Sequence, residues 1–365
     1  MNIFTKFKKR TLAFKITIIS LFSFLLINNI IFYIQPFAAD TIFEYYTTGY
    51  FSFITSLQHV FFGFLPFSIG DVLYIIVAVF LFINIIHFIF ALLLTRFQKL
   101  APIAVNTIGI ITLIWFLLGS QWNWNYLQPS LEDKLELESS DYNVEELAKF
   151  TNQLIFETAK SKDNSNFDIF SDDTNSIIDI SLLGYKTLAK KNDFFTYNNP
   201  SIKHSMFSEI LPFLGISGYY NPFTAEAQIT KGIPIVQIPF VINHEIAHQL
   251  GIASEAEANF IGYLASINNP LTTIQYSGNL SLLLYCLSDL RMREYENYED
   301  VIASIPDNVK NDINEIQEFW GSYSNKYRKY SDKGYDKFLK SNNQKEGLDS
   351  YNKVVSLAIF YNRKK

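Results

Sequence analysis

Three long runs of uncharged, apolar residues in the first third of the chain limit its possible folds more than any other feature. Residues 16–36, 72–94 and 101–120 contain no Lys, Arg, Asp or Glu. A helix needs about 20 mainly apolar residues to cross the hydrocarbon core of a membrane. Uncharged helices of this length are rare in soluble folds, so we prefer three transmembrane helices to three buried core helices. A cleaved signal peptide is a poor alternative for the first run, which is too long and lacks a small-residue cleavage site.

The distribution of basic residues predicts how these helices are oriented, because cytoplasmic flanks carry an excess of Lys and Arg. Arg96 and Lys99 lie between the second and third runs, whereas residues 37–71 contain acidic residues but no basic ones. Five basic residues precede the first run: Lys6, Lys8, Lys9, Arg10 and Lys15. We therefore predict a cytoplasmic N-terminus and an extracytoplasmic location for everything after the third run.

Aromatic residues next to the predicted spans indicate contact with the membrane surface. The segment 41–64 is rich in Phe and Tyr, and we expect it to lie along the outer surface of the bilayer. Trp122, Trp124 and Tyr126 follow the third run, where an aromatic belt commonly marks the interface.

Overall composition excludes several functional classes. The formal net charge of −5 gives no basic footprint for nucleic acid. Cys286 is the single cysteine, so an intramolecular disulfide and a zinc site made of several thiolates are both excluded. Any metal site in this chain needs histidine and carboxylate ligands.

The composition changes after residue 122 to a mixture of charged residues with Asn and Ser, which divides the chain into an anchor (1–122) and an extracytoplasmic domain (123–365). Helical periodicity recurs in this second part, at residues 141–160, 176–190, 280–293, 307–320 and 350–361. Strand signals are limited to residues 225–230 and to the run 233–240, which its two prolines reduce to an edge strand or a loop. We predict a mainly helical α+β domain with a small sheet.

The sequence His-Glu-Ile-Ala-His at residues 244–248 carries the strongest chemical signal. Side chains four apart on a helix lie on one face, so His244 and His248 could bind one metal ion. Glu245 would lie beside them and could hold the metal-bound water. Gly251 is well placed to end the helix. Without a metal, the pair would be a fortuitous feature of a surface helix.

A catalytic zinc site needs a third protein ligand and an open position for water. Glu255 and Glu257 are the candidates, on a second helix that we expect to begin at Ser254. Ser254 and Glu257 have the spacing of a capping box, which would give Glu257 a structural role. We therefore favour Glu255 as the ligand, with Glu257 as the alternative and with Asn259 as a hydrogen-bond partner of a ligand.

At these residues the chain resembles the gluzincin branch of the zincin metallopeptidases, in which a Glu ligand follows the His-Glu-x-x-His motif on a second helix. Two departures from that pattern are visible. Asn259 stands where gluzincins have an Asp, and the interval from His248 to Glu255 is shorter than in most of them. Gly251 is similar to the glycine of metzincins, but Ser254 occupies the position of their third histidine.

A wider resemblance covers nearly the whole chain and rests on residues 214–224, 244–249, 257–260 and 350–355. These segments are similar to a bacterial family of multi-span membrane proteins, chiefly from Bacteroidota. That family is a domain of unknown function, grouped with zincin-like peptidases by its zinc motif. The resemblance implies a zincin-like fold and a location in the bacterial cytoplasmic (inner) membrane, and it implies no substrate.

Together these features predict a membrane-anchored metallopeptidase that uses Zn²⁺ to hydrolyse a peptide or protein substrate. Glu245 is the expected general base, and Tyr219, Tyr220 or His204 could bind the oxyanion or the substrate. Residues 226–229 could offer an edge to an extended peptide, with Glu226 as a solvated strand residue.

The leading alternative is a zincin-like domain that senses or binds a ligand at the membrane surface without catalysis. An inactive scaffold would not need Glu245, which the chain retains. An intramembrane protease would place the motif within a long apolar span, and the run before His244 is short and broken by prolines.

Overall fold

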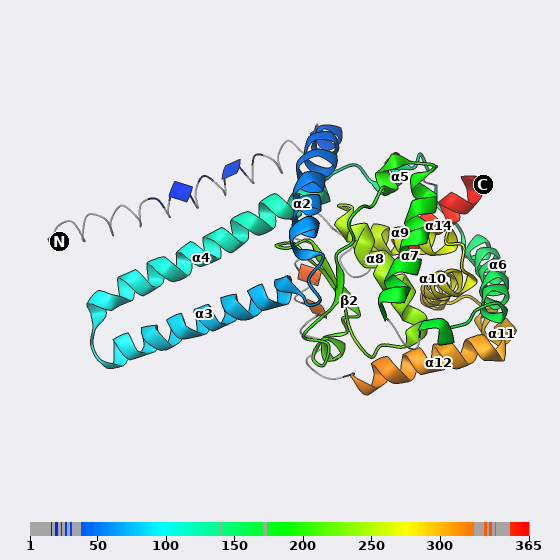
Figure 1. Cartoon of the computed structure of the whole chain (residues 1–365). Coiled ribbons are helices and arrows are strands. Elements are labelled where there is room, and N and C mark those ends of the chain that lie inside the picture. Colours follow the sequence, from blue (N-terminus) through cyan, green and yellow to red (C-terminus); the bar gives the residue numbers. More distant parts are fainter. Residues whose placement is uncertain are drawn as a thin grey trace.

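The computed structural model describes residues 38–138, 140–170, 174–324 and 351–364, with scattered positions between residues 16 and 30 and between residues 332 and 340. The first predicted span, residues 16–36, lies for the most part outside the described residues. The remaining elements form a helical body from which two long helices project (Figure 1).

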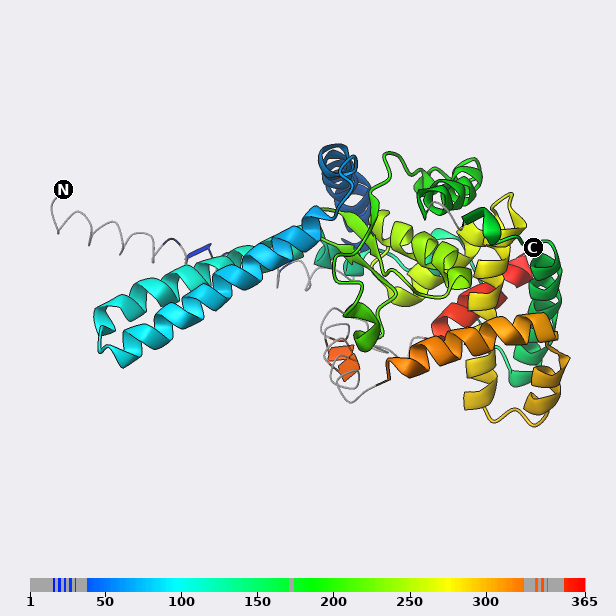
Figure 2. The same cartoon turned by 60° about the horizontal axis from the view of Figure 1, so that its bottom comes forward.

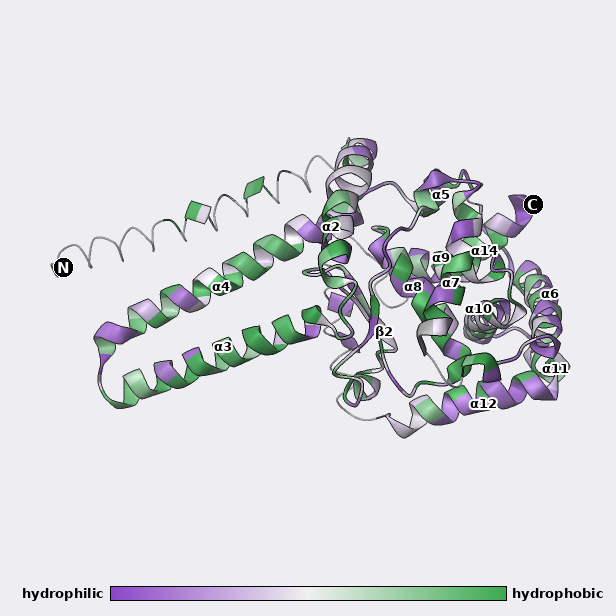
Figure 3. Cartoon of the chain, viewed as in Figure 1, coloured by the Kyte–Doolittle hydropathy of each residue, from purple (hydrophilic) through white to green (hydrophobic). Residues whose placement is uncertain are grey.

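The two projecting helices are α3 (Ile69–Leu93) and α4 (Leu100–Gln121), which run side by side and are joined by a short turn containing η2 (Phe97–Lys99). Both are long and apolar enough to cross a membrane. A core helix of a soluble protein would be mostly buried, but only 11% and 6% of their most apolar windows are buried, and Figure 3 shows apolar residues along their length. The second and third predicted helices are thus confirmed as apolar helices, and their crossing of a membrane stays a prediction.

Helix α3 begins three residues before the predicted start of the span. The Ser68 hydroxyl accepts a hydrogen bond from the backbone N–H of Asp71 at 3.0 Å and so caps the helix. Asp71 is an acidic residue, yet it is fully buried against the body of the protein. An acidic residue at this position therefore extends the helix within the protein interior.

Two shorter elements precede α3, the π-helical segment η1 (Ile42–Phe51) and α2 (Ser52–Phe62). They pack against each other and lie across the ends of the projecting helices, at the junction with the body (Figures 1 and 2). This is the aromatic segment that the sequence places on the membrane surface.

The sheet consists of three short strands in the order β1-β3-β2: β1 (Ile202–His204), β3 (Glu226–Ile229) and β2 (Gly218–Asn221). Strand β3 pairs in parallel with β1 and antiparallel with β2. The prediction that residues 226–229 form an exposed edge is therefore wrong, because β3 is the central strand. All four of its residues are buried.

The run 233–240 is also different from the expectation of an edge strand or loop. It forms η7 (Ile235–Gln237) and the first turn of α8 (Ile238–Gln249). Pro239 lies in that first turn, where the missing N–H of proline costs nothing and its fixed φ suits the helix. The prolines therefore start a helix here.

Helices make up most of the body, as the sequence predicts. Near the junction lie η3 (Asn123–Leu127) and α5 (Leu131–Lys134). The longer helices are α6 (Val144–Asp163), α7 (Thr174–Ala189), α9 (Glu255–Ile267), α10 (Thr272–Met292), α12 (Asp307–Ser322) and α14 (Tyr351–Lys364). The shorter ones are η4 (Asp168–Phe170), η5 (Asp193–Phe195), η6 (Leu211–Leu214) and α11 (Tyr298–Ser304).

One hydrophobic core joins α6, α8, α9, α10 and α14, whose inward side chains pack together. Ile242, Phe260, Leu283 and Val355 are completely buried in it. Helix α8 lies between the sheet and helices α9 and α10, so its side chains are held from several directions. This packing gives the His-Glu-Ile-Ala-His segment a fixed scaffold.

Candidate functional site

Helix α8 presents His244 and His248 on one face, and a Schellman turn ends the helix immediately afterwards. The N–H of Gly251 bonds to the carbonyl of His248 at 2.9 Å, and the N–H of Ile252 bonds to the carbonyl of Ala247 at 3.1 Å. Gly251 has a φ of +89°, which favours glycine. The expectation that Gly251 ends the helix is confirmed.

This turn also orients one of the histidines. The Ile252 carbonyl lies 2.6 Å from Nδ1 of His248, and a carbonyl can only accept a hydrogen bond. Nδ1 therefore carries the proton, and Nε2 keeps a lone pair that points towards His244. A backbone carbonyl that fixes the tautomer in this way is typical of histidines that bind metals.

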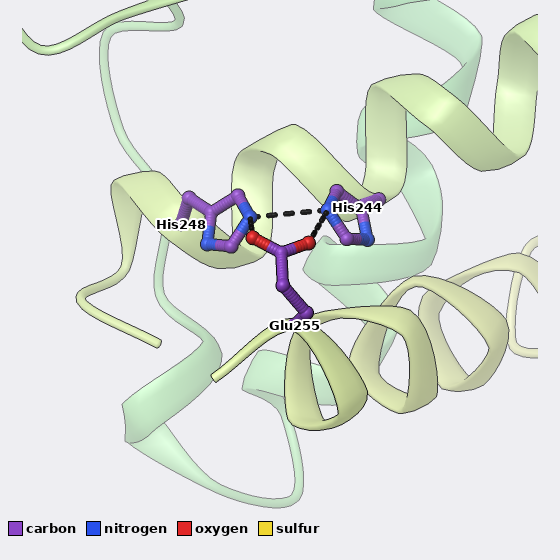
Figure 4. A group of neighbouring side chains, drawn as sticks. All are labelled: His244, His248 and Glu255. Carbon is purple, nitrogen blue, oxygen red and sulfur yellow. Dashed lines mark hydrogen bonds and ion pairs between the residues drawn. The ribbon is translucent and has the colours of Figure 1, made fainter. Parts of the chain in front are cut away.

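Helix α9 supplies the third member of the cluster from its first residue, Glu255. One carboxylate oxygen lies 3.4 Å from Nε2 of His244 and the other lies 3.6 Å from Nε2 of His248. The two Nε2 atoms are 3.0 Å apart. Figure 4 shows the carboxylate facing both imidazoles across the gap between the helices. The three possible ligand atoms all lie within 4.8 Å of one another, so they could hold one metal ion.

Glu257, the alternative ligand, does not belong to this cluster. Its carboxylate accepts a hydrogen bond from the backbone N–H of Leu131 at 3.1 Å and lies 3.5 Å from Nζ of Lys353. The predicted capping box is wrong, because Ser254 is the N-cap residue of α9 but makes no side-chain capping bond. Glu257 has a structural role of another kind, which ties α9 to α5 and α14.

Asn259 lies one turn after Glu255 and lines the same cleft. Its role as a hydrogen-bond partner of a ligand stays a prediction. For His244, desolvation by burial lowers the pKa, but the neighbouring carboxylates of Glu255 and Glu245 raise it above its usual value overall. The two acidic residues thus make this region attractive to a cation.

Glu245 projects into the cleft beside the cluster and is 3% exposed. Its Oε2 atom is buried and has no hydrogen-bond partner among the described residues. Burial raises the pKa of Glu245 to about 8, against the opposing effect of His244. Gly218 leaves room for this side chain, since a Cβ at that position would lie 2.8 Å from Oε1 of Glu245.

The cluster lies in a cleft of about 880 Å³. Strand β2 and the residues just before it form one wall, and helices α8, α9 and α10 contribute to the others. Leu118, Trp122 and Tyr126 also line the cleft, at the end of the apolar helix α4 and in η3. The site is therefore built partly from the body and partly from the foot of a projecting helix.

Trp122 and Tyr126, expected in an aromatic belt facing lipid, pack inside the protein instead. They are 7% and 8% exposed and form a small core with Tyr46, Phe51 and Ala253. The ring of Trp122 meets the imidazole of His248 edge-on, with centroids 5.6 Å apart. The belt prediction is wrong for these two residues because the end of α4 is covered by η1 and by the turn after α8.

The three residues predicted to bind an oxyanion or substrate lie in different environments. Tyr219 lines the cleft, but its hydroxyl donates a hydrogen bond to Asp71 of α3. Tyr220 also lines the cleft, and its ring packs against Trp122 with centroids 4.6 Å apart. His204 lies on β1 and is not among the residues that line the cleft.

Glu226 is completely buried, so the prediction of a solvated strand residue is wrong. Its carboxylate accepts hydrogen bonds from the N–H groups of Ile69 and Gly70, at 3.2 and 2.6 Å, and pairs with Nζ of Lys203 at 2.5 Å. This places a carboxylate at the N-terminus of α3, where the helix dipole favours negative charge. Asp71, in the first turn of α3, accepts hydrogen bonds from the backbone N–H of Met206 at 2.7 Å and from Tyr219.

Sequence reasoning missed this buried junction, which we call the α3 joint and define as Ser68, Asp71, Lys203, Tyr219 and Glu226. Ser68 and Asp71 lie more than 130 residues before the other three members in the chain, and no local pattern links the two groups. The sequence signal that could have indicated this junction is the polar Ser-x-x-Asp at the start of an apolar helix.

Fold and site together define a mostly helical protein with a small sheet, two long apolar helices and a buried His/Glu cluster in a cleft. The chain belongs to the family described as Protein of unknown function (DUF3810), whose model matches residues 46–359. That range includes the candidate cluster, both apolar helices and most of the body. No curated protein and no solved structure is significantly similar to the chain.

Proposed function

We propose that this protein is a membrane-anchored zinc metallopeptidase that hydrolyses peptide bonds. The observation that carries the proposal is the convergence of His244, His248 and Glu255 on one point, with the buried carboxylate of Glu245 beside it. The family description supplies no activity, so the proposal rests on the geometry and chemistry of the site.

The distances within the cluster fit a tetrahedral zinc site. Zinc lies about 2.0–2.1 Å from histidine nitrogen, and the edges of such a tetrahedron are about 3.3–3.4 Å long. Here the two imidazole nitrogens are 3.0 Å apart, and a different oxygen of Glu255 lies near each of them, 3.4 Å from His244 and 3.6 Å from His248. One oxygen of Glu255 and the two nitrogens lie within 4.8 Å of one another, so side-chain movements would be needed to bring three donors to equal distances from one ion.

The types of donor also favour zinc over the common hard cations. Two imidazole nitrogens and one carboxylate are a usual set for catalytic zinc, whereas magnesium and calcium prefer oxygen ligands. Three protein ligands leave a position open for water, as catalytic sites require. Bound zinc would supply Lewis-acid chemistry, lowering the pKa of water and polarising a substrate carbonyl.

Glu245 is the residue to which we assign proton transfer. Its unpaired Oε2 atom can accept a proton from water as the oxygen attacks a peptide carbonyl, and can then give the proton to the departing amine. The raised pKa of Glu245 applies to the metal-free protein. A cation between the two histidines and Glu255 would favour the ionised carboxylate.

Tyr220 is the better placed of the two cleft tyrosines for contact with a substrate, because Tyr219 already donates to Asp71. Strands β1 and β2 are the two edge strands of the described sheet, each paired on one side only. Since the residues of β2 line the cleft, an extended peptide could add to it as a further strand. This transfers to β2 the role that sequence reasoning gave to residues 226–229.

We further propose that α3 and α4 anchor the chain in the bacterial cytoplasmic membrane, with the first apolar run as a third span and the body on the extracytoplasmic side. Length, apolar composition and low burial of α3 and α4 support the anchoring. Arg96 and Lys99 at the turn between them support the orientation, because basic residues favour the cytoplasmic side.

The alternative is a domain that binds a ligand or senses it without hydrolysis. Metal analysis of the full-length protein in detergent, combined with cleavage of a random fluorogenic peptide library, separates the two. We expect stoichiometric zinc in wild type and in Glu245→Gln, with cleavage in wild type alone. The substitution keeps the size of the side chain but removes its ability to accept the proton.

Zinc in both forms with cleavage in neither would favour the binding domain. Absence of zinc from the wild-type protein, even after incubation with excess metal, would contradict the metallopeptidase altogether.

A further inference from the structure

Helix α2 has its amphipathic pattern reversed relative to a helix on the surface of a soluble protein. Its inward face carries Thr55 and His59, which are 5% and 3% exposed. Its outward face carries large apolar side chains, among them Phe53 and Phe61, which are 65% and 60% exposed. A surface helix in water normally shows the opposite arrangement.

The polar inward face of α2 is held by the same part of the protein that forms the candidate site. Nε2 of His59 lies 2.8 Å from the carbonyl of Ala225, just before β3. The Gln249 side chain, at the end of α8, donates to that same carbonyl at 2.8 Å. The orientation of α2 is therefore fixed relative to α8, and its apolar face is left uncovered by the described residues.

The position of α2 indicates what covers that face. Residue 62 ends α2 and residue 69 begins α3, so the apolar face continues directly into an apolar helix. Figures 1 and 3 show α2 lying across the base of α3 and α4, where they leave the body. A helix with aromatic residues on one face and this position is suited to the interface between lipid headgroups and acyl chains.

The candidate site lies at the same level as this interface. Helix α4 has 22 residues, and about 20 are needed to cross the hydrocarbon core. Leu118, in its last turn, therefore lies near the edge of that core, and Leu118 lines the cleft. Trp122, one turn further on, touches the imidazole of His248. A single ring thus separates the end of a proposed span from a proposed metal ligand.

We propose that the site acts on membrane-anchored polypeptides, at the extramembrane segment next to their hydrophobic anchor. This inference rests on the proposed peptidase function and names its substrate class. A cleft this close to the lipid surface can reach the few residues that follow a membrane anchor. Leu118 and the other apolar cleft residues, such as Leu214, Ile216 and Phe240, would contact the apolar residues at that point.

The test uses full-length protein in lipid vesicles and one random peptide segment, flanked by a fluorophore and a quencher, in three settings. In the first, the segment directly follows a transmembrane helix. In the second, a Gly/Ser spacer of about 40 residues, with a root-mean-square length of about 35 Å, separates the segment from the same helix. In the third, the segment is soluble.

We expect the adjacent segment to be cleaved roughly tenfold faster than the spaced one, which has the same tether but spends most of its time away from the surface. Equal or faster cleavage of the spaced segment would overturn the inference and leave the peptidase standing. Cleavage of none of the three by wild type would contradict the peptidase, and the inference with it.

Matched variants test the role of α2. Phe53→Glu places a charge on its outward face, and Phe156→Glu does the same on α6, where Phe156 is also 65% exposed. We expect Phe53→Glu to reduce the preference for the adjacent segment while the cleavage rate for the soluble peptide stays unchanged. Phe156→Glu should alter neither rate. An unchanged preference in Phe53→Glu would show that α2 does not set the height of the site above the membrane.

Discussion

Gly232 and Gly251 share a left-handed backbone but differ in their surroundings. Their φ angles are +79° and +89°. A Cβ at position 232 would meet nothing within 4 Å, whereas one at position 251 would lie 2.8 Å from Cγ2 of Thr47. The turn after α8 thus touches η1, which connects the geometry of His248 to the junction with the apolar helices.

Replacing each of these two glycines by alanine distinguishes the cost of left-handed backbone strain from the cost of steric crowding. A left-handed alanine costs about 1–2 kcal/mol, and overpacking adds about 1–3 kcal/mol. We expect Gly232→Ala to lower the melting temperature by a few degrees and Gly251→Ala to lower it by clearly more, measured by tryptophan fluorescence in detergent. Equal shifts would mean that η1 moves aside without cost.

Glu255 and Glu257 give a second comparison between neighbouring residues. Glu255→Ala should abolish stoichiometric zinc binding, because two histidines alone leave the site incomplete. Glu257→Ala should keep the metal but lower the melting temperature, since the buried N–H of Leu131 loses its acceptor at a cost of about 1–3 kcal/mol. Metal content by mass spectrometry checks both, and zinc loss in Glu257→Ala alone would overturn the assignment.

Which features of this site could be predicted from the sequence depends on how far apart the interacting residues lie along the chain. His244 and His248 could be paired from spacing alone, because four residues bring them to one face of any helix. The capping box was wrong because the partner of Glu257, Leu131, is 126 residues away. Likewise, nothing local indicated that Gly218 leaves room for Glu245.

Among the elements, the central strand β3 shows what periodicity cannot predict. Its strand character was predictable, but its burial depends on β1 and β2 along its two edges and on α8 and the start of α3, which contact its side chains. The two apolar helices were predicted to within three residues at each end, because their signal is compositional and continuous. Helix α8 was predicted around residues 244–248, but its first turn was concealed by prolines that also suit a loop.

The α3 joint makes a prediction about how the apolar helices are held. The side chains of Lys203 and Glu226 are 4% and 0% exposed, and loss of one partner from such a buried pair costs about 3–5 kcal/mol. We therefore expect Glu226→Gln to destabilise the protein strongly in thermal unfolding. Glu146→Gln, which breaks the exposed pair with Arg363, should cost at most about 1 kcal/mol.

A double variant checks the cause of that loss. If the cost comes from the uncompensated charge of Lys203, Lys203→Met combined with Glu226→Gln should be more stable than Glu226→Gln alone, which a double-mutant cycle measures. Additive losses would instead point to the hydrogen bonds that Glu226 makes to the N-terminus of α3.

For the molecule as a whole, the proposed metal would add a further link between helices that are already joined by packing and by a hydrogen bond from Asn243 to Ser266. Helix α8 would supply two ligands and α9 one, and Trp122, at the end of α4, packs against the imidazole of His248. A ligand that binds only the folded state stabilises it by about 2.7 kcal/mol at 100 times its dissociation constant. For a domain of 150–250 residues this corresponds to a rise of about 5–10 °C in melting temperature.

We therefore expect chelation to lower the melting temperature of full-length protein by several degrees, and added zinc to restore it. Added magnesium should not restore the melting temperature, because two of the three donors are imidazoles, which that ion disfavours. The melting temperature of Glu255→Ala should change with neither chelator nor zinc. A wild-type melting temperature that is the same with chelator and with saturating zinc would mean that the cluster holds no ion, and that its three side chains serve only to join α8 to α9.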